Sequence, residues 1–134
     1  PYTTLFRSPQ LAKRFDFHEA KDIRNAPLLH LTTRPDAWEH WLRHYGVDDR
    51  GVQGMLFDQF TTLFEAAAAG LGVALLPDFL FADDLRSGRI VQALPMPLQS
   101  NDAYHLCWPD DRSAYRPLAV FRDWLLEETA ADRA

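Results

Sequence analysis

The sequence predicts an α/β domain with a mostly parallel sheet, because strand-like and helix-like patterns alternate along its 134 residues. The clearest pattern runs from Asp58 to Pro77, where an amphipathic helix leads directly into a wholly apolar run. Four apolar residues of its first half share the spacing of one helix face: Phe60, Leu63, Phe64 and Ala67. The run Val73–Leu76 predicts a strand covered on both faces.

The ends of this central helix carry recognisable signals. Asp58 is expected to be the N-cap, because its carboxylate can accept hydrogen bonds from the amides of the first turn. Gly70 is expected to end the helix in the left-handed conformation, which costs glycine little. The chain therefore passes from helix to buried strand with almost no loop.

Three elements are predicted before it. Ser8 followed by proline marks a helix start, so a short helix is expected over Gln10–Phe15. Leu28–Thr32 is expected to be a strand, and Pro35 to open a helix that Gly46 ends. The apolar face of that helix has aromatic and leucine residues at helical spacing: Trp38, Trp41, Leu42 and Tyr45.

Shorter elements surround the central stretch. Met55–Phe57 predicts a brief strand before it. After it, Asp78 is expected to cap a helix over Phe79–Arg86 that Gly88 terminates, and Ile90–Leu94 predicts another strand.

The C-terminal part begins with a change in composition. Pro95, Pro97 and the polar run Gln99–Asp102 predict a linker. Tyr104–Trp108 alternates in the manner of a half-buried strand, and Pro117 is expected to open the last helix. Four residues of that helix are expected on one side: Leu118, Phe121, Trp124 and Leu125.

Charge and cysteine content exclude several classes of protein. A net charge of -5 and a pI near 5.4 argue against this segment gripping a nucleic-acid backbone, which requires clustered lysine and arginine. The single cysteine, Cys107, excludes an internal disulfide and suits a reducing cytoplasm. The sequence has neither an apolar run long enough to cross a membrane nor a signal-peptide pattern at its start.

Two motifs invite a cofactor or metal interpretation that the pattern disfavours. Gly70 and Gly72 lie in a helix-to-strand order, whereas a dinucleotide loop runs from strand to helix and has a third glycine. His40 and His44 have a spacing that can hold a metal, but they lie opposite the aromatic face and are expected to face water. No cofactor and no metal site are predicted.

A catalytic interpretation is also weak. Cys107 and His105 point to the same face of a predicted strand, yet no third member or oxyanion-binding turn accompanies them. Packing in the strand is the favoured interpretation, and the chain is not predicted to be an enzyme.

A binding site is the more natural prediction. In open α/β sheets, ligands bind at the carboxyl ends of strands, where helix amides can hold a carboxylate. Hydroxyl and amide groups there can orient a polar ligand, an arginine can add a charged bond, and a phenylalanine can form an apolar wall. The candidate binding residues are Thr32, Thr33, Arg34, Asp58, Gln59 and Phe60. The alternative is that Thr33 and Asp58 only cap helices and that Arg34 is solvated.

The segment Ala68–Pro77 also resembles the effector-binding domain of LysR-type transcriptional regulators, in the branch of the glycine-cleavage and β-lactamase regulators. The resemblance extends from about Ser8 to Glu128. It includes four further segments in the same order: Ser8–Ala12, Pro27–Leu31, Arg34–Trp38 and Phe121–Leu126.

The resemblance implies a two-lobed, periplasmic-binding-protein-like fold of type II. Residues 8–103 would form effector-binding subdomain II, and residues 104–134 would be the crossover strand and final helix of subdomain I. The chain would be a C-terminal fragment. Residues 1–7 match the family poorly, so they are either a non-native leader or a divergent edge strand.

The implied function is non-enzymatic sensing of a small effector, placed between the lobes near Thr33 and Gln59–Phe60. The resemblance also implies an amino-acid-like effector, a homodimer or tetramer, cytoplasmic location without membrane contact, and DNA binding only through a missing N-terminal domain. The main alternative is a solute-binding protein of a transporter, which would share the fold.

Overall fold

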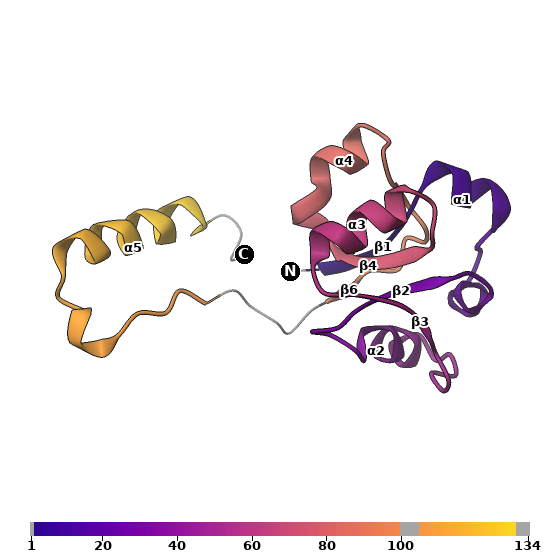
Figure 1. Cartoon of the computed structure of the whole chain (residues 1–134), viewed down its shortest axis with the longest axis horizontal. Helices are drawn as coiled ribbons and strands as arrows, with labels where there is room; N and C mark the ends of the chain where they lie inside the picture. The colour runs from indigo at the N-terminus through magenta and orange to yellow at the C-terminus, as the bar shows by residue number, and fades with distance from the viewer. Residues whose placement is uncertain (1, 100–104, 131–134) are drawn as a thin grey trace. The chain divides into compact units, whose positions relative to one another are not determined.

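A six-stranded sheet organises the larger of the two units that the chain forms, Tyr2–Ser100. The computed structural model describes residues 2–99 and 105–130 (Figure 1). The strand order is β3-β2-β4-β1-β5, and β6 pairs with β1. The strands are β1 (Tyr2–Arg7), β2 (Leu28–Leu31), β3 (Gly54–Phe57), β4 (Val73–Pro77), β5 (Val91–Gln92) and β6 (Leu98–Gln99).

The sheet is mixed, and not mostly parallel as the alternation of elements suggested. β2 is parallel to both β3 and β4, as expected of strands joined by helical crossovers. β1 is antiparallel to β4, β5 and β6. Local patterns carry no information about the direction of a strand whose partners lie far along the chain, so this feature was not predictable.

β1 lies inside the sheet, between β4 and β5, so its interpretation as an edge strand is wrong. Leu5 is paired with Leu75 and Phe6 with Ala74. Both Leu5 and Phe6 are 0% exposed, one on each face of the sheet. The strand therefore contributes to both halves of the core.

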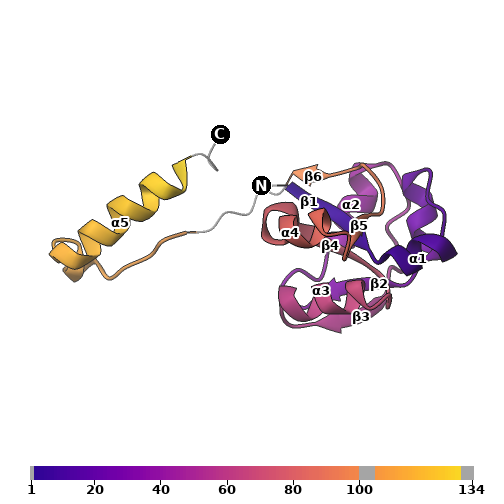
Figure 2. The same cartoon turned by 90° about the horizontal axis from the view of Figure 1, so that it is seen from above.

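Two hydrophobic clusters cover the two faces of the sheet, and α2 (Ala37–His44) and α3 (Phe60–Ala68) belong to different clusters. Trp38, Trp41 and Leu42 of α2 pack with Leu28 and Val73 of the sheet. Four residues of α3 pack on the other face: Leu63, Phe64, Ala66 and Ala67. The strand residues alternate between the clusters, and Figures 1 and 2 show the two helices on opposite sides of the sheet.

Short helices complete this unit: α1 (Pro9–Arg14), α4 (Ala82–Arg86) and the 3₁₀ segments η1 (Ala20–Asn25) and η2 (Asp78–Phe81). The predicted start of α1 is confirmed, because the Ser8 hydroxyl accepts a hydrogen bond from the Leu11 N–H at 3.0 Å. The single helix predicted over Phe79–Arg86 is instead η2 followed by α4.

The starts of α2 and α3 differ from prediction, whereas the glycine end of α3 agrees with it. α2 begins at Ala37, whereas Pro35 is predicted to open it. The N-cap of α3 is Gln59, so the prediction that Asp58 is the cap is wrong. Gly70 has φ 84°, as predicted. The Leu71 and Gly70 amides donate to the carbonyl oxygens of Ala66 and Ala67, both at 3.0 Å, which closes the helix with a Schellman motif.

The smaller unit consists of Pro1 and residues 101–134, of which residues 105–130 are described. The strand predicted over Tyr104–Trp108 is wrong for residues 105–108, which lie in neither helix nor strand; Tyr104 lies outside the described residues. The last helix is α5 (Arg116–Glu128), preceded by the 3₁₀ turn η3 (Asp110–Arg112). Among residues 2–99 and 105–130, no helix combines the length and apolarity needed to cross a membrane.

Candidate functional site

The two predicted binding segments lie side by side, because β2 and β3 are parallel and end together. Leu31 is paired with Phe57, the last residue of each strand. The Thr32 N–H donates to the Phe57 carbonyl oxygen at 2.8 Å, which extends the ladder by one step. Residues 32–34 and 58–60 therefore meet beyond the carboxyl ends of the parallel strands. This region, where β2, β3 and β4 all end, is called here the carboxyl edge.

The chain leaves this edge in two directions. After β2 it continues into α2 on one face, and after β3 into α3 on the other face. Neighbouring parallel strands whose connections diverge in this way form a topological switch point. Ligands of open α/β sheets bind outside the strand ends at such points.

The segment after β2 is a tight turn. The Arg34 N–H donates to the Leu31 carbonyl oxygen at 2.9 Å. Thr32 and Thr33 are exposed and Arg34 is half-buried. The N-cap of α2 is Asp36, so the alternative in which Thr33 only caps this helix is wrong.

Arg34 also spans the carboxyl edge. Its guanidinium carbon lies 5.3 Å from the centroid of the Phe60 ring, within cation–π distance. The contact connects the turn after β2 with the first residue of α3. A positive charge and an aromatic face are thus held beside one another.

The first turn of α3 offers further hydrogen-bonding groups. Within the described part of the chain, the Gln59 side chain accepts no hydrogen bond from the backbone amides of this turn. Backbone amides in the first turn of a helix have no partner inside the helix, so they can bind an anion. The Thr62 hydroxyl donates to the Gln59 carbonyl oxygen at 2.9 Å, and Thr61 is exposed beside it.

Thr61 and Thr62 are further candidates that are not among the residues predicted from the sequence. The signal that points to them is a pair of hydroxyl residues directly after the start of a helix. With Gln59 as the cap, these residues are the second and third of α3 and lie in its first turn, at the carboxyl edge. Asp58 itself is exposed and precedes the cap.

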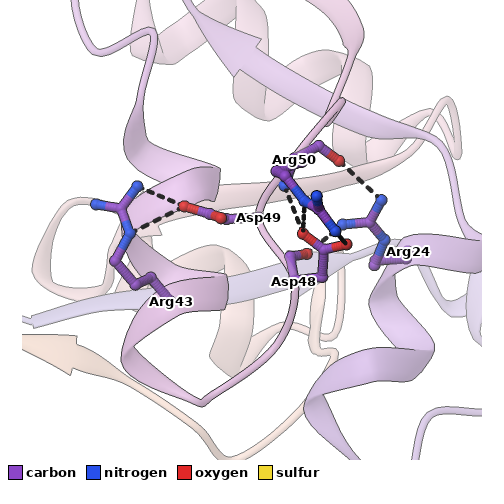
Figure 3. Close-up of polar contacts among 5 residues, drawn as sticks. All are labelled: Arg24, Arg43, Asp48, Asp49 and Arg50. Carbon is purple, nitrogen blue, oxygen red and sulfur yellow. Dashed lines mark hydrogen bonds and ion pairs between the residues drawn. The ribbon is translucent and has the colours of Figure 1, made fainter.

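An ion-pair cluster lies beside the amino end of β3, opposite the carboxyl edge (Figure 3). Arg24, at the end of η1, donates to the carbonyl oxygens of Asp48 and Arg50. The Arg50 Nε lies 2.9 Å from Asp48 Oδ1, and the Arg43 Nε lies 2.9 Å from Asp49 Oδ2. These bonds fix the loop that enters β3.

The cluster changes the titration of one carboxyl group. Hydrogen bonds from the Arg50 side chain and backbone, and the positive charges of Arg50 and Arg24, lower the pKa of Asp48 from 3.8 to about 2. The Arg50 side chain bonds both carboxylate oxygens of Asp48, at 2.9 and 3.1 Å. We assign this edge a structural role, because its charges already satisfy one another.

The other candidate residues do not assemble a site. His40 and His44 are exposed, and His40 Nδ1 lies 3.7 Å from Asp36 Oδ2. Cys107 is exposed, and its sulfur lies 4.0 Å from the His105 backbone oxygen. Across the described residues, no three histidine, cysteine or acidic side chains group in a way that could hold a metal ion.

Gly72 has a packing role. A Cβ at this position would lie 2.5 Å from the Pro27 carbonyl oxygen. The backbone of the segment between α3 and β4 therefore approaches the residue before β2 too closely for any side chain. The pair Gly70–Gly72 is explained by helix ending and close packing.

Comparison with known proteins identifies relatives over nearly the whole chain. The model of the LysR substrate binding domain family matches residues 5–130. The HTH-type transcriptional regulator TrpI of Pseudomonas aeruginosa is 36% identical over 92% of this chain and 42% of its own length. The HTH-type transcriptional activator AmpR of Rhodobacter capsulatus is 35% identical, over 92% and 41%. The glycine cleavage system transcriptional activator of Escherichia coli K12 is 31% identical, over 84% and 37%.

Solved structures show the same fold. The effector domain of AmpR from Pseudomonas aeruginosa superposes with a TM-score of 0.81 at 28% identity, over 98% of this chain and 62% of that chain. The regulatory domain of CrgA from Neisseria meningitidis superposes with a TM-score of 0.72 at 20% identity, over 96% and 66%. The chain spans about two fifths of the full-length TrpI and AmpR relatives.

Proposed function

The chain belongs to the family of LysR substrate-binding domains, and on this premise we propose that its carboxyl edge binds a small effector through the effector's carboxylate. It is the effector-binding domain of a LysR-type transcriptional regulator, with the periplasmic-binding-protein-like fold of type II. The relatives reported above are transcriptional regulators, not solute-binding proteins of transporters.

The observation that carries the proposal is the juxtaposition of Thr32–Arg34 with Asp58–Phe60 at a topological switch point. In the bound state, the carboxylate would accept hydrogen bonds from the first-turn amides of α3 and from Arg34. Thr33 and Gln59 would orient the ligand. Phe60 would cover its apolar part.

An amino-acid-like effector is the class that we propose. One relative is named as the activator of the glycine cleavage system, which connects this branch of the family with amino-acid metabolism. A carboxylate is one of the anionic groups that a helix amino terminus and an arginine can bind together.

Signalling in the proposed mechanism requires no chemical conversion of the effector. The bound ligand stabilises one of two arrangements of the regulator, and it can do so only if its affinity differs between them. We propose that the full-length regulator is a cytoplasmic homodimer or tetramer. It would bind DNA through a segment outside this chain, which is acidic overall with a net charge of -5.

We also propose that residues 8–103 correspond to effector-binding subdomain II and that residues 104–134 belong to subdomain I. The proposed effector contacts Thr32–Arg34 and Asp58–Phe60 all come from the first of these segments. They therefore belong to the unit that contains the sheet.

Alanine substitutions test this function. Thr33→Ala and Gln59→Ala should each reduce the rise in melting temperature that a carboxylate ligand causes, while the melting temperature without ligand changes little. Gln53→Ala is a matched control, because Gln53 is also exposed but precedes β3 at the opposite edge. An unchanged ligand response in both variants would contradict the proposed site, and so would conversion of the ligand.

A further inference from the structure

We propose that Asp78 binds the ammonium group of the effector, and that the effector is therefore a zwitterion lying across the end of β2. This inference rests on the proposed function, because it assigns the second charged end of a ligand whose carboxylate binds at Arg34 and α3. Asp78 is thereby a specificity-determining residue, whereas its sequence context predicts only a helix cap.

The sheet topology brings Asp78 to the carboxyl edge. β4 is parallel to β2 and lies on the side of β2 opposite β3. Its last residue, Pro77, therefore ends at the same edge as Leu31 and Phe57, and Asp78 follows directly. Across this edge the order is the first turn of α3, then the turn that contains Arg34, then Asp78.

The pairing of β2 differs on its two sides. All four residues of β2 are paired with β3, from Leu28 to Leu31. The pairs between β2 and β4 are Leu28 with Val73 and Leu29 with Ala74, near the start of both strands. Near the carboxyl ends of β2 and β4, directly before Asp78, the two strands are therefore not joined by ladder pairs.

The Asp78 carboxylate is oriented by its own backbone. Its Oδ1 accepts a hydrogen bond from the Phe79 N–H at 2.9 Å, and the side chain is half-buried. Oδ1 is thus occupied, whereas within residues 2–99 and 105–130 no donor bonds to Oδ2. An ammonium group can donate to that second oxygen without breaking the first bond.

Asp58 is the other carboxylate of the edge, and its position suits a different role. It is exposed and directly precedes the N-cap of α3. A negative side chain there interacts with the helix dipole, at the end of the site where the effector's own carboxylate is expected. The ammonium end should therefore lie at Asp78, across β2.

The spacing of strands limits the length of the effector. The ends of β3 and β4 are two strand spacings apart, about 10 Å between backbones. That distance, with a hydrogen bond of about 2.8 Å at each end, suits the two closely spaced charged groups of a single amino acid better than those of an extended peptide.

Ligands that lack one of the two charged groups test the two proposed contacts separately. This chain is titrated with each proteinogenic L-amino acid, its N-acetyl derivative and its amide, and dissociation constants are measured by NMR. The wild type should bind an amino acid about tenfold or more tightly than its N-acetyl derivative, because only the free amine donates to Asp78. Asp78→Asn, which keeps an oxygen acceptor for the Phe79 N–H, should remove this preference and leave N-acetyl binding unchanged.

A control, a competing variant and a second substitution of Asp78 complete the test. Asp83→Asn should retain the preference, because Asp83 pairs with Arg86 on α4. Asp58→Asn, at the other exposed carboxylate of the carboxyl edge, tests the competing assignment of the ammonium end to Asp58. Asp78→Ser also retains an acceptor and should behave as Asp78→Asn does if that variant folds poorly.

The outcomes distinguish this inference from the function on which it rests. Equal binding of an amino acid and its N-acetyl derivative by the wild type, with resonance shifts at Thr33 and Phe60, overturns the role of Asp78 and leaves the carboxylate site standing. Loss of the preference in Asp58→Asn but not in Asp78→Asn also overturns it. Absence of shifts at Thr33 and Phe60 with every ligand overturns the proposed function itself.

Discussion

The guanidinium of Arg34 lies over the ring of Phe60, with 5.3 Å between Cζ and the ring centroid. Arg34 belongs to the turn after β2, and Phe60 is the first residue of α3. The contact holds the charged and apolar parts of the proposed effector site together before any ligand binds. Such preorganisation reduces the ordering cost of binding.

Phe60→Leu tests the importance of this contact. Leucine keeps an apolar wall but removes the aromatic face under Arg34, so affinity for a carboxylate effector should fall roughly two- to fivefold. The melting temperature without ligand should change little, because Phe60 is only half-buried. Phe121→Leu, at an exposed position of α5, is the control, and an equal loss of affinity there would contradict the role of Phe60.

Gly70→Val should destabilise the fold by more than about 1 kcal/mol, because a β-branched residue at positive φ is strained. Gly70 has φ 84°, and an added Cβ would also lie 3.2 Å from the Ser8 hydroxyl oxygen. Urea denaturation measures the free energy of unfolding. Ala69→Val, one residue earlier with φ -73°, should cost much less, and equal losses would argue against a conformational cause.

Gly72→Ala should destabilise by about 1–3 kcal/mol through overpacking. The new methyl group would lie 2.5 Å from the Pro27 carbonyl oxygen and 2.9 Å from Leu29 Cδ2. The same denaturation experiment measures the loss. Wild-type stability in this variant would mean that the approach of the two backbone segments is looser than the structure indicates.

Asp48→Asn should lower stability at neutral pH, and the difference from wild type should disappear in acid. The pKa of Asp48 is about 2 in the folded chain against an ordinary value of 3.8, because arginine partners favour the carboxylate. The folded state therefore binds this proton less readily than the unfolded state does. The contribution is complete above pH 3.8 and is lost as the pH falls towards 2.

Urea denaturation of wild type and Asp48→Asn from neutral to acid pH checks this dependence. Asp110→Asn, at an exposed position of η3, controls for the general effect of removing a carboxylate. A stability difference that stays constant down to the lowest pH would refute the assignment to Asp48.

The central helix and strand could be predicted because local residues determine them. The apolar spacing of Leu63, Phe64 and Ala67 places one face of α3 in the core, and Gly70 ends the helix as expected. Val73–Pro77 is buried along its whole length, as its wholly apolar composition indicated. The family resemblance is likewise confirmed by the match over residues 5–130.

Features that depend on distant partners were not predictable. β1 acquires its interior position from pairing with β4, β5 and β6, which no local pattern encodes. The alternation in residues 105–108 resembles a strand, but alternation forms a strand only where a partner is available. The cap of α3 is Gln59, one residue beyond the predicted Asp58.

The candidate site combines features that local sequence predicts with features that depend on the strand order. The sequence predicts that Thr32–Arg34 and Asp58–Phe60 lie at the ends of strands, and the parallel pairing of Leu31 with Phe57 brings the two segments together. The contribution of Asp78 depends on β4 being the other neighbour of β2, which is a property of the strand order. The binding role of these residues stays a prediction.

The most direct test of the central claim is a residue-resolved map of ligand binding by two-dimensional ¹H–¹⁵N NMR. Amino acids and simple carboxylates are titrated into the ¹⁵N-labelled chain, and amide shifts are followed at every assigned residue. We expect the largest changes at Thr33, Phe60 and Thr61, at the carboxyl edge. Changes confined to the ion-pair cluster around Asp48–Arg50 or to α5 would contradict the proposed effector site.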